Sequence, residues 1–319
     1  MNEILTKLSL IGIVPVIKID DVEKAVPLAK ALVAGGIPCA EVTFRTEQAE
    51  EAIKRMAQEV PEMLVGAGTV LTEEQADRAV NAGAKFLISP GLNPKIVKYC
   101  VDKGYLITPG TTNPSDVEQA IELGLDVVKF FPAEAAGGLN MIKSMAAPYT
   151  KMKFMPTGGI NAKNLNSYLD FDKIICCGGS WMVNEDLINN GEFDKITELC
   201  KEAVSTMLGF TIGHVGINAE NPSDAGSMAE TFNKMFNFEI GEGNSSIFLD
   251  KSIEIMKEPY LGAKGHIAIK TNYMSRAINY LENNGFELDE STKKEKNGKV
   301  IAIYLKDHVG GFAVHLLQK

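Results

Sequence analysis

The chain has 319 residues, 45% of them hydrophobic, and a formal net charge of −9. Its length allows one large domain and a smaller one. No apolar run reaches the length of a membrane span. The acidic charge is dispersed, which argues against a nucleic-acid partner, because such a partner would require a basic patch. The mixed-charge start MNEILTKLSL predicts a first helix and no signal peptide, so we expect a soluble cytoplasmic protein.

Eight short apolar runs recur at roughly even intervals through the first 210 residues. They begin at residues 13, 39, 64, 86, 106, 127, 154 and 174. Segments with a helical period, such as DVEKAVPLAKALVAGG and TEQAEEAIKRMAQEV, lie between them. Nearly continuous apolar strands that alternate with helices indicate a parallel sheet covered by helices. This length suits a closed (β/α)8 TIM barrel, an α/β fold, and a doubly wound open sheet is the alternative.

Polar residues and glycines gather in or just after these expected strands. They include Glu41, Thr43, Arg45, Gly66, Gly68, Thr69, Pro90, Gly91, Thr111, Thr112, Lys129, Thr157, Gly158, Gly159, Gly178, Gly179 and Ser180. In a barrel the loops after the strands carry the chemistry. Glycine pairs after the last two strands would expose backbone N–H groups that can hold a phosphate, although they can also serve simply as turn residues.

Lys129 lies inside DVVKFFPAEAAGG, a run that otherwise has the pattern of a buried strand. Lysine is depleted in strands and rarely buried, and two explanations remain open: an edge position whose amine reaches water, or an amine kept dry in order to react. Burial and neighbouring positive charge lower the pKa of an amine, and an unprotonated amine can form an iminium with a ketone.

The rest of the expected site supports the reactive amine. The first 210 residues contain no histidine, so carboxylates, lysine or water must carry the acid–base chemistry there. Glu41 is the natural proton shuttle, although it could instead form a structural ion pair with Arg45. A lysine, a carboxylate, an arginine for an acidic substrate and a phosphate loop together predict a Schiff-base aldolase that acts on a phosphorylated keto acid.

Seven motifs, in order along the chain, resemble the 2-keto-3-deoxy-6-phosphogluconate (KDPG) aldolases, which include bifunctional 4-hydroxy-2-oxoglutarate (KHG) aldolases. The motifs are VPVIKIDDVEKAVPLAKALVAGGI, EVTFRTE, VGAGTV, ISPG, VKFFPAEAAGG, PTGGI and GGSWMV. They lie within residues 1–205, and we take 1–210 as the aldolase domain. The resemblance implies a homotrimeric class I aldolase that cleaves KDPG to pyruvate and glyceraldehyde 3-phosphate, KHG to pyruvate and glyoxylate, or both, without a metal or other cofactor in this site.

The same resemblance implies roles for individual residues. Lys129 matches the Schiff-base lysine and Glu41 the general acid–base residue. The substrate-binding residues would be Arg45, Thr69, Pro90, Thr157 and Lys18, and the phosphate-binding residues Gly158, Gly159, Gly179 and Ser180. The chain departs from the family pattern at Lys18, where many members carry arginine; a lysine cannot make the bidentate grip of a guanidinium group. Thr69 could also be a core residue and Ser180 a helix cap.

Residues 212–319 contain an internal repeat. GHVGIN at 213–218 returns as GHIAIK at 265–270, and each copy precedes an amphipathic helix and strand-like runs. The repeat predicts an α+β domain of two modules, each with one strand, a helix and three strands (βαβββ).

This second part resembles the vicinal oxygen chelate superfamily, which includes the glyoxalases. In metal-using members the ligands come from the first and last strands of each module. Those positions hold His214, Glu254, His266 and His315, side chains that suit a divalent metal. His315 stands where glutamate is common, and the alternative is that these histidines only form local hydrogen bonds.

Other functions remain open on the sequence alone. The barrel could be another phosphate-binding enzyme, such as a phosphogalactonate-type aldolase or a thiamine-phosphate-synthase-like enzyme, or a non-catalytic ligand-binding barrel with a C-terminal assembly module. The second domain could act on a small molecule or sense one. Five cysteines without a metal-ligand spacing indicate buried thiols in a reducing compartment.

Overall fold

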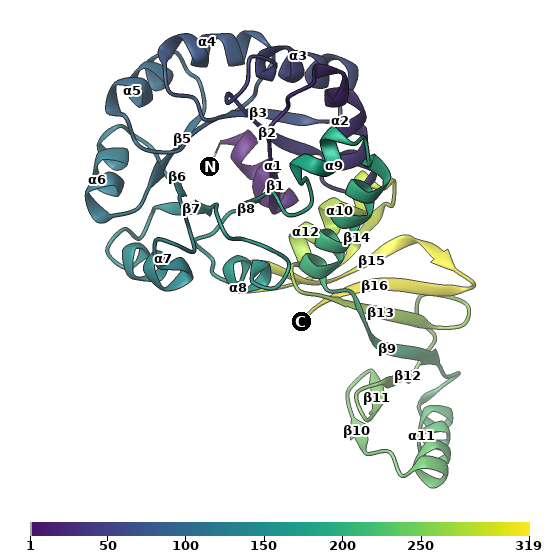
Figure 1. Ribbon diagram of the computed structural model, residues 1–319. Helices are drawn as coiled ribbons and strands as arrows, with labels where there is room; N and C mark the ends of the chain where they lie inside the picture. The colour runs from purple at the N-terminus through teal and green to yellow at the C-terminus, as the bar shows by residue number, and fades with distance from the viewer. Residues whose placement is uncertain (1) are drawn as a thin grey trace. The chain divides into compact units, whose positions relative to one another are not determined.

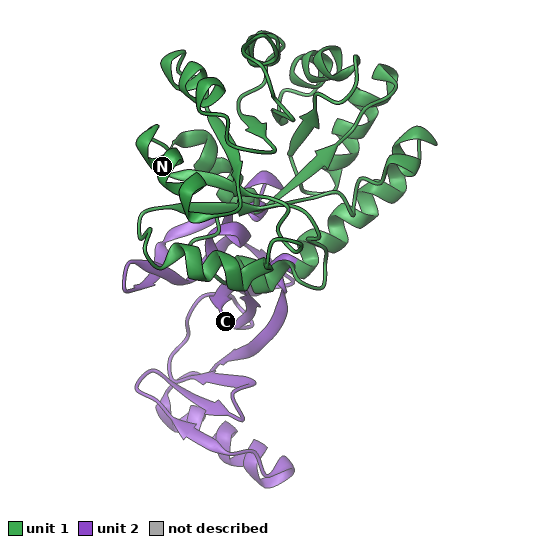
Figure 2. Cartoon of the chain, turned by 60° about the vertical axis from the view of Figure 1, so that its left-hand side comes forward, with its two compact units in different colours: residues 1–206 green, residues 207–319 purple. Residues whose placement is uncertain are grey.

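The computed structural model describes residues 2–319 as two compact units, the first ending at Thr206 and the second beginning at Met207 (Figure 2). All five cysteines are buried, as the sequence predicted. Within residues 2–319, no helix combines the length and the apolar character needed to cross a membrane.

Eight parallel strands form the centre of the first unit (Figure 1). They are β1 (Ile13–Ile17), β2 (Cys39–Thr43), β3 (Leu64–Gly68), β4 (Leu87–Ser89), β5 (Ile107–Thr111), β6 (Val127–Phe130), β7 (Lys153–Pro156) and β8 (Cys177–Gly179). The strand order is β7-β6-β5-β4-β3-β2-β1-β8, and two isolated bridges, Phe154 with Ile174 and Thr157 with Gly178, join its two ends. The sheet is therefore a nearly closed TIM-like barrel and not the alternative open sheet.

Helices surround this barrel in Figure 1, except α1, which lies over the centre of the barrel in this view. They are α1 (Glu3–Ile11), α2 (Ala25–Ala34), α3 (Ala49–Glu59), α4 (Glu73–Asn81), α5 (Pro94–Asp102), α6 (Pro114–Glu122), α7 (Gly138–Ala146), α8 (Leu165–Leu169), α9 (Glu185–Asn189) and α10 (Phe193–Leu208), with a short 3₁₀ turn at Val22–Lys24. Several starts are fixed by side chains: Thr72, Asn93 and Asn113 each accept a hydrogen bond from a backbone N–H of the first turn. Such caps stabilise a helix by about 1 kcal/mol each.

The strands carry apolar side chains on both faces, which explains their continuous hydrophobic pattern. Because side chains alternate along a strand, Val128 and Phe130 face the helices while Lys129 faces the barrel interior. The same alternation turns Glu41 inward between Ala40 and Val42, and all of these residues are buried. One strand thus supplies core contacts on one face and a buried amine on the other.

The second unit contains two copies of one strand, a helix and three strands. The first copy is β9 (Thr211–Asn218), α11 (Pro222–Phe236), β10 (Ile240–Glu242), β11 (Ser246–Leu249) and β12 (Ile253–Met256), and the second is β13 (His266–Thr271), α12 (Met274–Asn283), β14 (Leu288–Lys296), β15 (Lys299–Val309) and β16 (Phe312–Gln318). They form one mixed sheet in the order β10-β11-β12-β9-β13-β16-β15-β14. The first strands of the two copies, β9 and β13, pair at its centre.

Candidate functional site

Lys129 and Glu41 face each other inside the barrel. The Lys129 ammonium group donates a hydrogen bond to Glu41 Oε1 at 3.2 Å, and the two side chains are only 6% and 1% exposed. The edge position, in which the amine of Lys129 would reach water, is therefore excluded. Glu41 pairs with Lys129 and not with Arg45, so the alternative structural ion pair is also absent among residues 2–319.

This buried pair can transfer a proton without creating net charge. Moving a proton from Lys129 Nζ to Glu41 Oε1 converts an ion pair into a neutral amine beside a carboxylic acid, and both states are neutral overall. A single uncompensated buried charge costs more than either of these two states, in which the net charge of the pair is zero. The second carboxylate oxygen, Glu41 Oε2, is buried and has no hydrogen-bond partner in the described part of the chain. It is therefore free to exchange a proton with a bound molecule.

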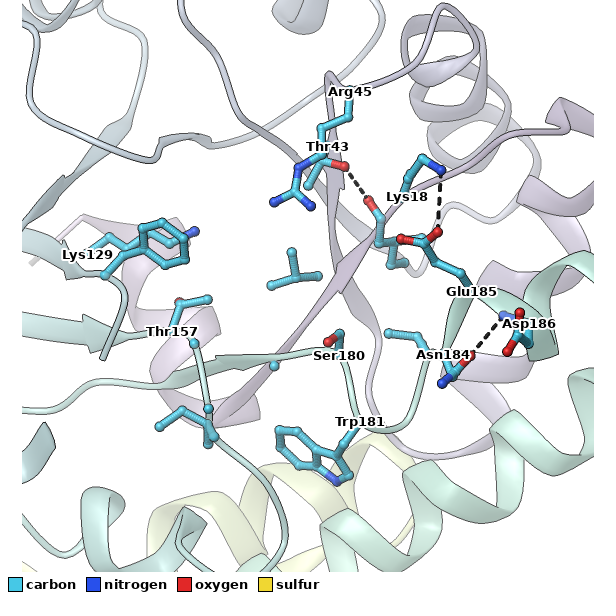
Figure 3. Close-up of a pocket in the computed structure, with 18 residues that line it drawn as sticks. Lys18, Thr43, Arg45, Lys129, Thr157, Ser180, Trp181, Asn184, Glu185 and Asp186 are labelled. Atoms are coloured by element: carbon cyan, nitrogen blue, oxygen red, sulfur yellow. Dashed lines mark hydrogen bonds and ion pairs between the residues drawn. The ribbon is translucent and has the colours of Figure 1, made fainter. Parts of the chain in front are cut away.

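A cavity of about 530 Å³ opens beside this pair (Figure 3). Its lining includes Lys129, Arg45, Thr157, Gly158, Gly159, Gly179, Ser180 and Lys18, all of them predicted site residues. In Figure 3 Lys129 and Thr157 lie on one side of the cavity, and Lys18 lies across from them. The tertiary structure thus brings strands β1, β2, β6, β7 and β8 to a single opening.

Arg45 and Thr69 form a polar pair that can hold a carboxylate. Arg45 Nε donates to Thr69 Oγ1 at 3.4 Å, which joins the loops after β2 and β3. Thr69 has a φ of 58°, an uncommon conformation for a threonine that often marks a functional position. Thr157 Oγ1 is buried and has no hydrogen-bond partner within residues 2–319, so it can bind a group placed next to Lys129.

Three glycines, Gly158, Gly159 and Gly179, also line the cavity. Gly158 and Gly159 have φ values of 100° and 82°, a left-handed conformation that glycine adopts without strain. Successive backbone N–H groups in such loops can surround an anion. Ser180 follows β8 and is exposed; the side chain that caps α9 is Asn184 and not Ser180.

Some cavity residues were not predicted from the sequence. Phe131 places its ring 5.1 Å from Lys129 Nζ, and Trp181, Glu185 and Asp186 also line the cavity. The sequence could have indicated Phe131, because it lies two positions after Lys129. It could not have indicated Glu185, which contacts Lys18 from 167 positions away. Pro90 is half-buried and is not among the residues that line this cavity.

A second cluster lies in the mixed sheet of the other unit. The side chains of His214, His266 and His315 are buried and converge, with one potential ligand atom from each within 4.8 Å of the others. Glu254 Oε2 lies 3.0 Å from His214 Nε2 and 3.1 Å from His266 Nε2. The four residues named from the sequence therefore meet, whereas His308 is exposed.

Strand register explains why these side chains meet. His214 on β9 pairs with Ala268 on β13, which in turn pairs with His315 on β16. His266 and Glu254 both pair with Gly216 of β9. Residues two apart share a face of a strand, so all four side chains lie on one face. A Cβ at position 216 would overlap the His266 imidazole, and glycine there leaves the space that the ring occupies.

The electrostatics of this cluster favour ligand-like protonation states. Burial acts to raise the pKa of Glu254, but hydrogen bonds from the two histidines and Ser246 outweigh it and hold that pKa well below its ordinary value. Burial, and then the neighbouring imidazoles, lower the pKa of His315 to about 4, so its ring is neutral at pH 7. His315 Nε2 and His266 Nδ1 are buried without a hydrogen-bond partner among residues 2–319.

The first unit is similar to a well-characterised group of enzymes. The family model for KDPG and KHG aldolase matches residues 3–199. The 2-dehydro-3-deoxy-phosphogluconate aldolase of Treponema pallidum is 48% identical over 204 residues, which are 64% of this chain and 97% of that protein. The KHG/KDPG aldolase of Escherichia coli is 46% identical over 192 residues, 60% of this chain and 90% of that protein.

Solved structures give the same result. The KDPG aldolase of Legionella pneumophila, with pyruvate captured at low pH as a covalent carbinolamine intermediate, is 40% identical, with a TM-score of 0.61 over 63% of this chain and 98% of that one. The KDPG aldolase of Zymomonas mobilis with 3-phosphoglycerate is 45% identical, with a TM-score of 0.60 over 64% of this chain and 95% of that one.

A substitution at Gly68 tests how tightly the buried pair of Lys129 and Glu41 is packed. A Cβ at this position would overlap the Glu41 carboxylate, so we expect Gly68→Ala to lower the free energy of unfolding by about 1–3 kcal/mol, the usual cost of overpacking. Urea unfolding would measure the change.

Gly91→Ala is the matched control, because a Cβ there meets no atom within 4 Å. In a Glu41→Ala background the cost of Gly68→Ala should shrink, since the colliding carboxylate is gone. An equal cost in both backgrounds would show that the strain does not come from Glu41.

Proposed function

The chain belongs to the KDPG and KHG aldolase family, and from this premise we propose that its barrel is a class I aldolase, a lyase that cleaves KDPG to pyruvate and glyceraldehyde 3-phosphate, KHG to pyruvate and glyoxylate, or both. The observation that carries the proposal is the hydrogen bond from Lys129, which lines the cavity, to the buried carboxylate of Glu41. A binding protein has no need of a buried amine opposite a carboxylate.

The reaction begins at Lys129. Glu41 takes a proton from the ammonium group, and the neutral amine attacks the C2 carbonyl of the keto acid to form a carbinolamine. Glu41 then returns the proton to the carbinolamine hydroxyl, which leaves as water, and a C=N bond forms between the lysine and C2. The resulting iminium is positively charged and withdraws electrons from the adjacent carbon–carbon bonds.

The iminium permits carbon–carbon cleavage. Glu41, whose Oε2 lacks a partner within the described chain, accepts the proton of the C4 hydroxyl, directly or through water. The C4–O bond becomes a carbonyl, the C3–C4 bond breaks, and its electron pair forms the C2–C3 double bond of an enamine. After the aldehyde leaves, a proton returns to C3, and water hydrolyses the iminium to pyruvate and free Lys129.

Positioning falls to the groups around the pair. We assign the pyruvate carboxylate to Arg45 and Thr69, and the region next to the imine to Thr157. The glycine loops and Ser180 would take the distal phosphate of KDPG. The structure of the Zymomonas mobilis relative with 3-phosphoglycerate supports a phosphate site in this fold. Pro90 stays a prediction as part of the wall of the site.

The proposed aldolase chemistry uses no metal, because the iminium does the work of a Lewis acid. The homotrimer and the cytoplasmic location stay predictions from the family resemblance, and sedimentation of the purified chain would test the first. Buried cysteine side chains fit a reducing compartment.

For the second unit we propose a vicinal-oxygen-chelate fold that binds one divalent metal through His214, Glu254, His266 and His315. The two copies of strand, helix and three strands support this fold. Two facing imidazole nitrogens 3.1 Å apart, a carboxylate oxygen within reach of both and the unpartnered nitrogen of His315 support the metal. Such a set suits zinc, iron, nickel or manganese. A bound metal would polarise a small oxygen-containing ligand, in an enzyme or a sensor.

Reduction with borohydride in the presence of pyruvate tests the aldolase. We expect a stable adduct on Lys129, identified by peptide mass spectrometry, and none in Lys129→Met, because only an iminium is trapped. Lys153→Met, a change on the neighbouring strand β7, should leave the adduct intact. An unmodified Lys129 in the folded protein would contradict the mechanism and favour the non-catalytic barrel.

The proton-transfer role of Glu41 has a separate kinetic test. Glu41→Gln should lower kcat for pyruvate release by about 10²- to 10⁴-fold, the usual contribution of general acid–base catalysis. Measuring release from KDPG and from KHG also tells which aldehyde the enzyme prefers. A variant that keeps wild-type kcat on both substrates would remove Glu41 from the mechanism.

Metal uptake tests the second unit. Metal-stripped protein should bind one divalent ion per chain. The bound ion should raise the unfolding temperature of this unit, because a metal concentration of 100 times Kd adds about 2.7 kcal/mol to its free energy of unfolding. His266→Ala should lose both effects, whereas His308→Ala, at an exposed histidine, should keep them. If the wild type takes up no stoichiometric metal, the histidines only form local hydrogen bonds.

A further inference from the structure

We propose that Glu185 is a specificity-determining residue of the barrel: its carboxylate competes with the distal phosphate of a substrate for the ammonium group of Lys18. This inference rests on the proposed aldolase function, because it concerns the far end of the same cavity. Its consequence is that the chain binds phosphorylated substrates less tightly than its glycine loops alone would allow.

The competition is visible in the contacts of Lys18. Its Nζ lies 3.0 Å from Asp20 Oδ2 and 3.3 Å from Glu185 Oε2, so two carboxylates already share one ammonium group. Hydrogen bonds to Asp20 and then to Glu185 raise the pKa of Lys18, which keeps it cationic at neutral pH. The cation that should attract a distal anion is thus neutralised before the substrate arrives.

Glu185 is the competitor that faces the cavity. It lines the cavity together with Lys18, whereas Asp20 is not among the lining residues. Asp20 lies two residues after Lys18 in the same loop, but Glu185 is the first residue of α9, 167 positions away. In Figure 3 the Lys18–Glu185 pair lies opposite Lys129, beside Ser180, where the distal end of a substrate bound at Lys129 would lie.

The charges at this end of the cavity favour the same conclusion. Lys18 is the only cationic side chain there among the lining residues, with Glu185 and Asp186 as anions; Arg45 and Lys129 lie at the imine end. The remaining groups are backbone N–H dipoles and the Ser180 hydroxyl. A phosphate of nearly two negative charges therefore meets a wall whose side chains are negative overall, and like charges at this range lower affinity.

The effect depends on the substrate. A KDPG molecule must place its phosphate near the glycine loops and so displace Glu185 from Lys18. The same sugar acid without its phosphate, or the shorter KHG, needs no such displacement. Glu185 should therefore weaken the binding of phosphorylated substrates and leave the others unchanged.

Trp181 allows a direct binding test with inorganic phosphate. It is the one tryptophan of the chain and lines the cavity beside Ser180, so its fluorescence reports occupancy without catalysis. We expect Glu185→Gln to lower the Kd for inorganic phosphate by about twofold to fivefold, in the range of an ion pair that is partly exposed. High salt should reduce the difference.

Two further variants separate competition from a general loss of negative charge. Asp186→Asn removes a carboxylate that lines the cavity but forms no ion pair with Lys18 within residues 2–319, and it should tighten phosphate binding less than Glu185→Gln. In a Lys18→Met background, Glu185→Gln should tighten phosphate binding much less, because only the repulsion by the carboxylate is then removed. Unchanged or weaker phosphate binding in Glu185→Gln, equal tightening in Asp186→Asn, or tightening that is undiminished without Lys18 would each overturn the proposal.

Kinetics connect binding with specificity. In Glu185→Gln the KM for KDPG should fall by a similar factor, while the KM for unphosphorylated 2-keto-3-deoxygluconate stays constant. If the wild type releases pyruvate from neither substrate, the aldolase proposal fails, and the fluorescence titration still decides the role of Glu185. If pyruvate is released but Glu185→Gln does not change the preference for the phosphate, only the present inference fails.

Discussion

A buried hydrogen bond between an ammonium group and a carboxylate is the interaction on which the barrel site depends. Removing both charges from water has a large desolvation cost, and a hydrophobic pair of similar volume would stabilise the fold at least as well. The pair of Lys129 and Glu41 is therefore better explained by chemistry than by stability. Its net neutrality allows one proton to move inside a dry barrel, which is what an amine nucleophile requires.

The surrounding residues make room for this pair and for its substrate. Gly68 leaves the volume that the Glu41 carboxylate occupies, and Gly178 does the same for the Thr157 hydroxyl. Gly158 and Gly159 adopt backbone conformations that other residues avoid. Glycine at these positions thus reflects space and backbone geometry needed by the site, and these constraints come from neighbouring strands and not from the local sequence.

The two units build their sites by the same means. In the barrel, parallel strands carry polar side chains to one opening; in the mixed sheet, the pairing of β12, β9, β13 and β16 places three imidazoles and a carboxylate on one face. Each copy of the repeat supplies two of these four groups. A metal bound among them would join the two copies, so metal affinity and folding of this unit would be coupled.

The sequence by itself determined eight parallel strands covered by helices, because eight apolar runs alternate with helix-period segments. It also singled out Lys129 as a candidate reactive amine, because a lysine in such a run needs a reason. The order of the motifs predicted the KDPG and KHG aldolase family. The repeat of GHVGIN as GHIAIK predicted two copies of one strand, a helix and three strands. Only the tertiary structure decided that Glu41 pairs with Lys129 and not with Arg45, and that Lys18 is held by Glu185. Those contacts join residues 88 and 167 positions apart, and hydrophobic periodicity specifies which face a residue occupies but not which distant side chain it meets there.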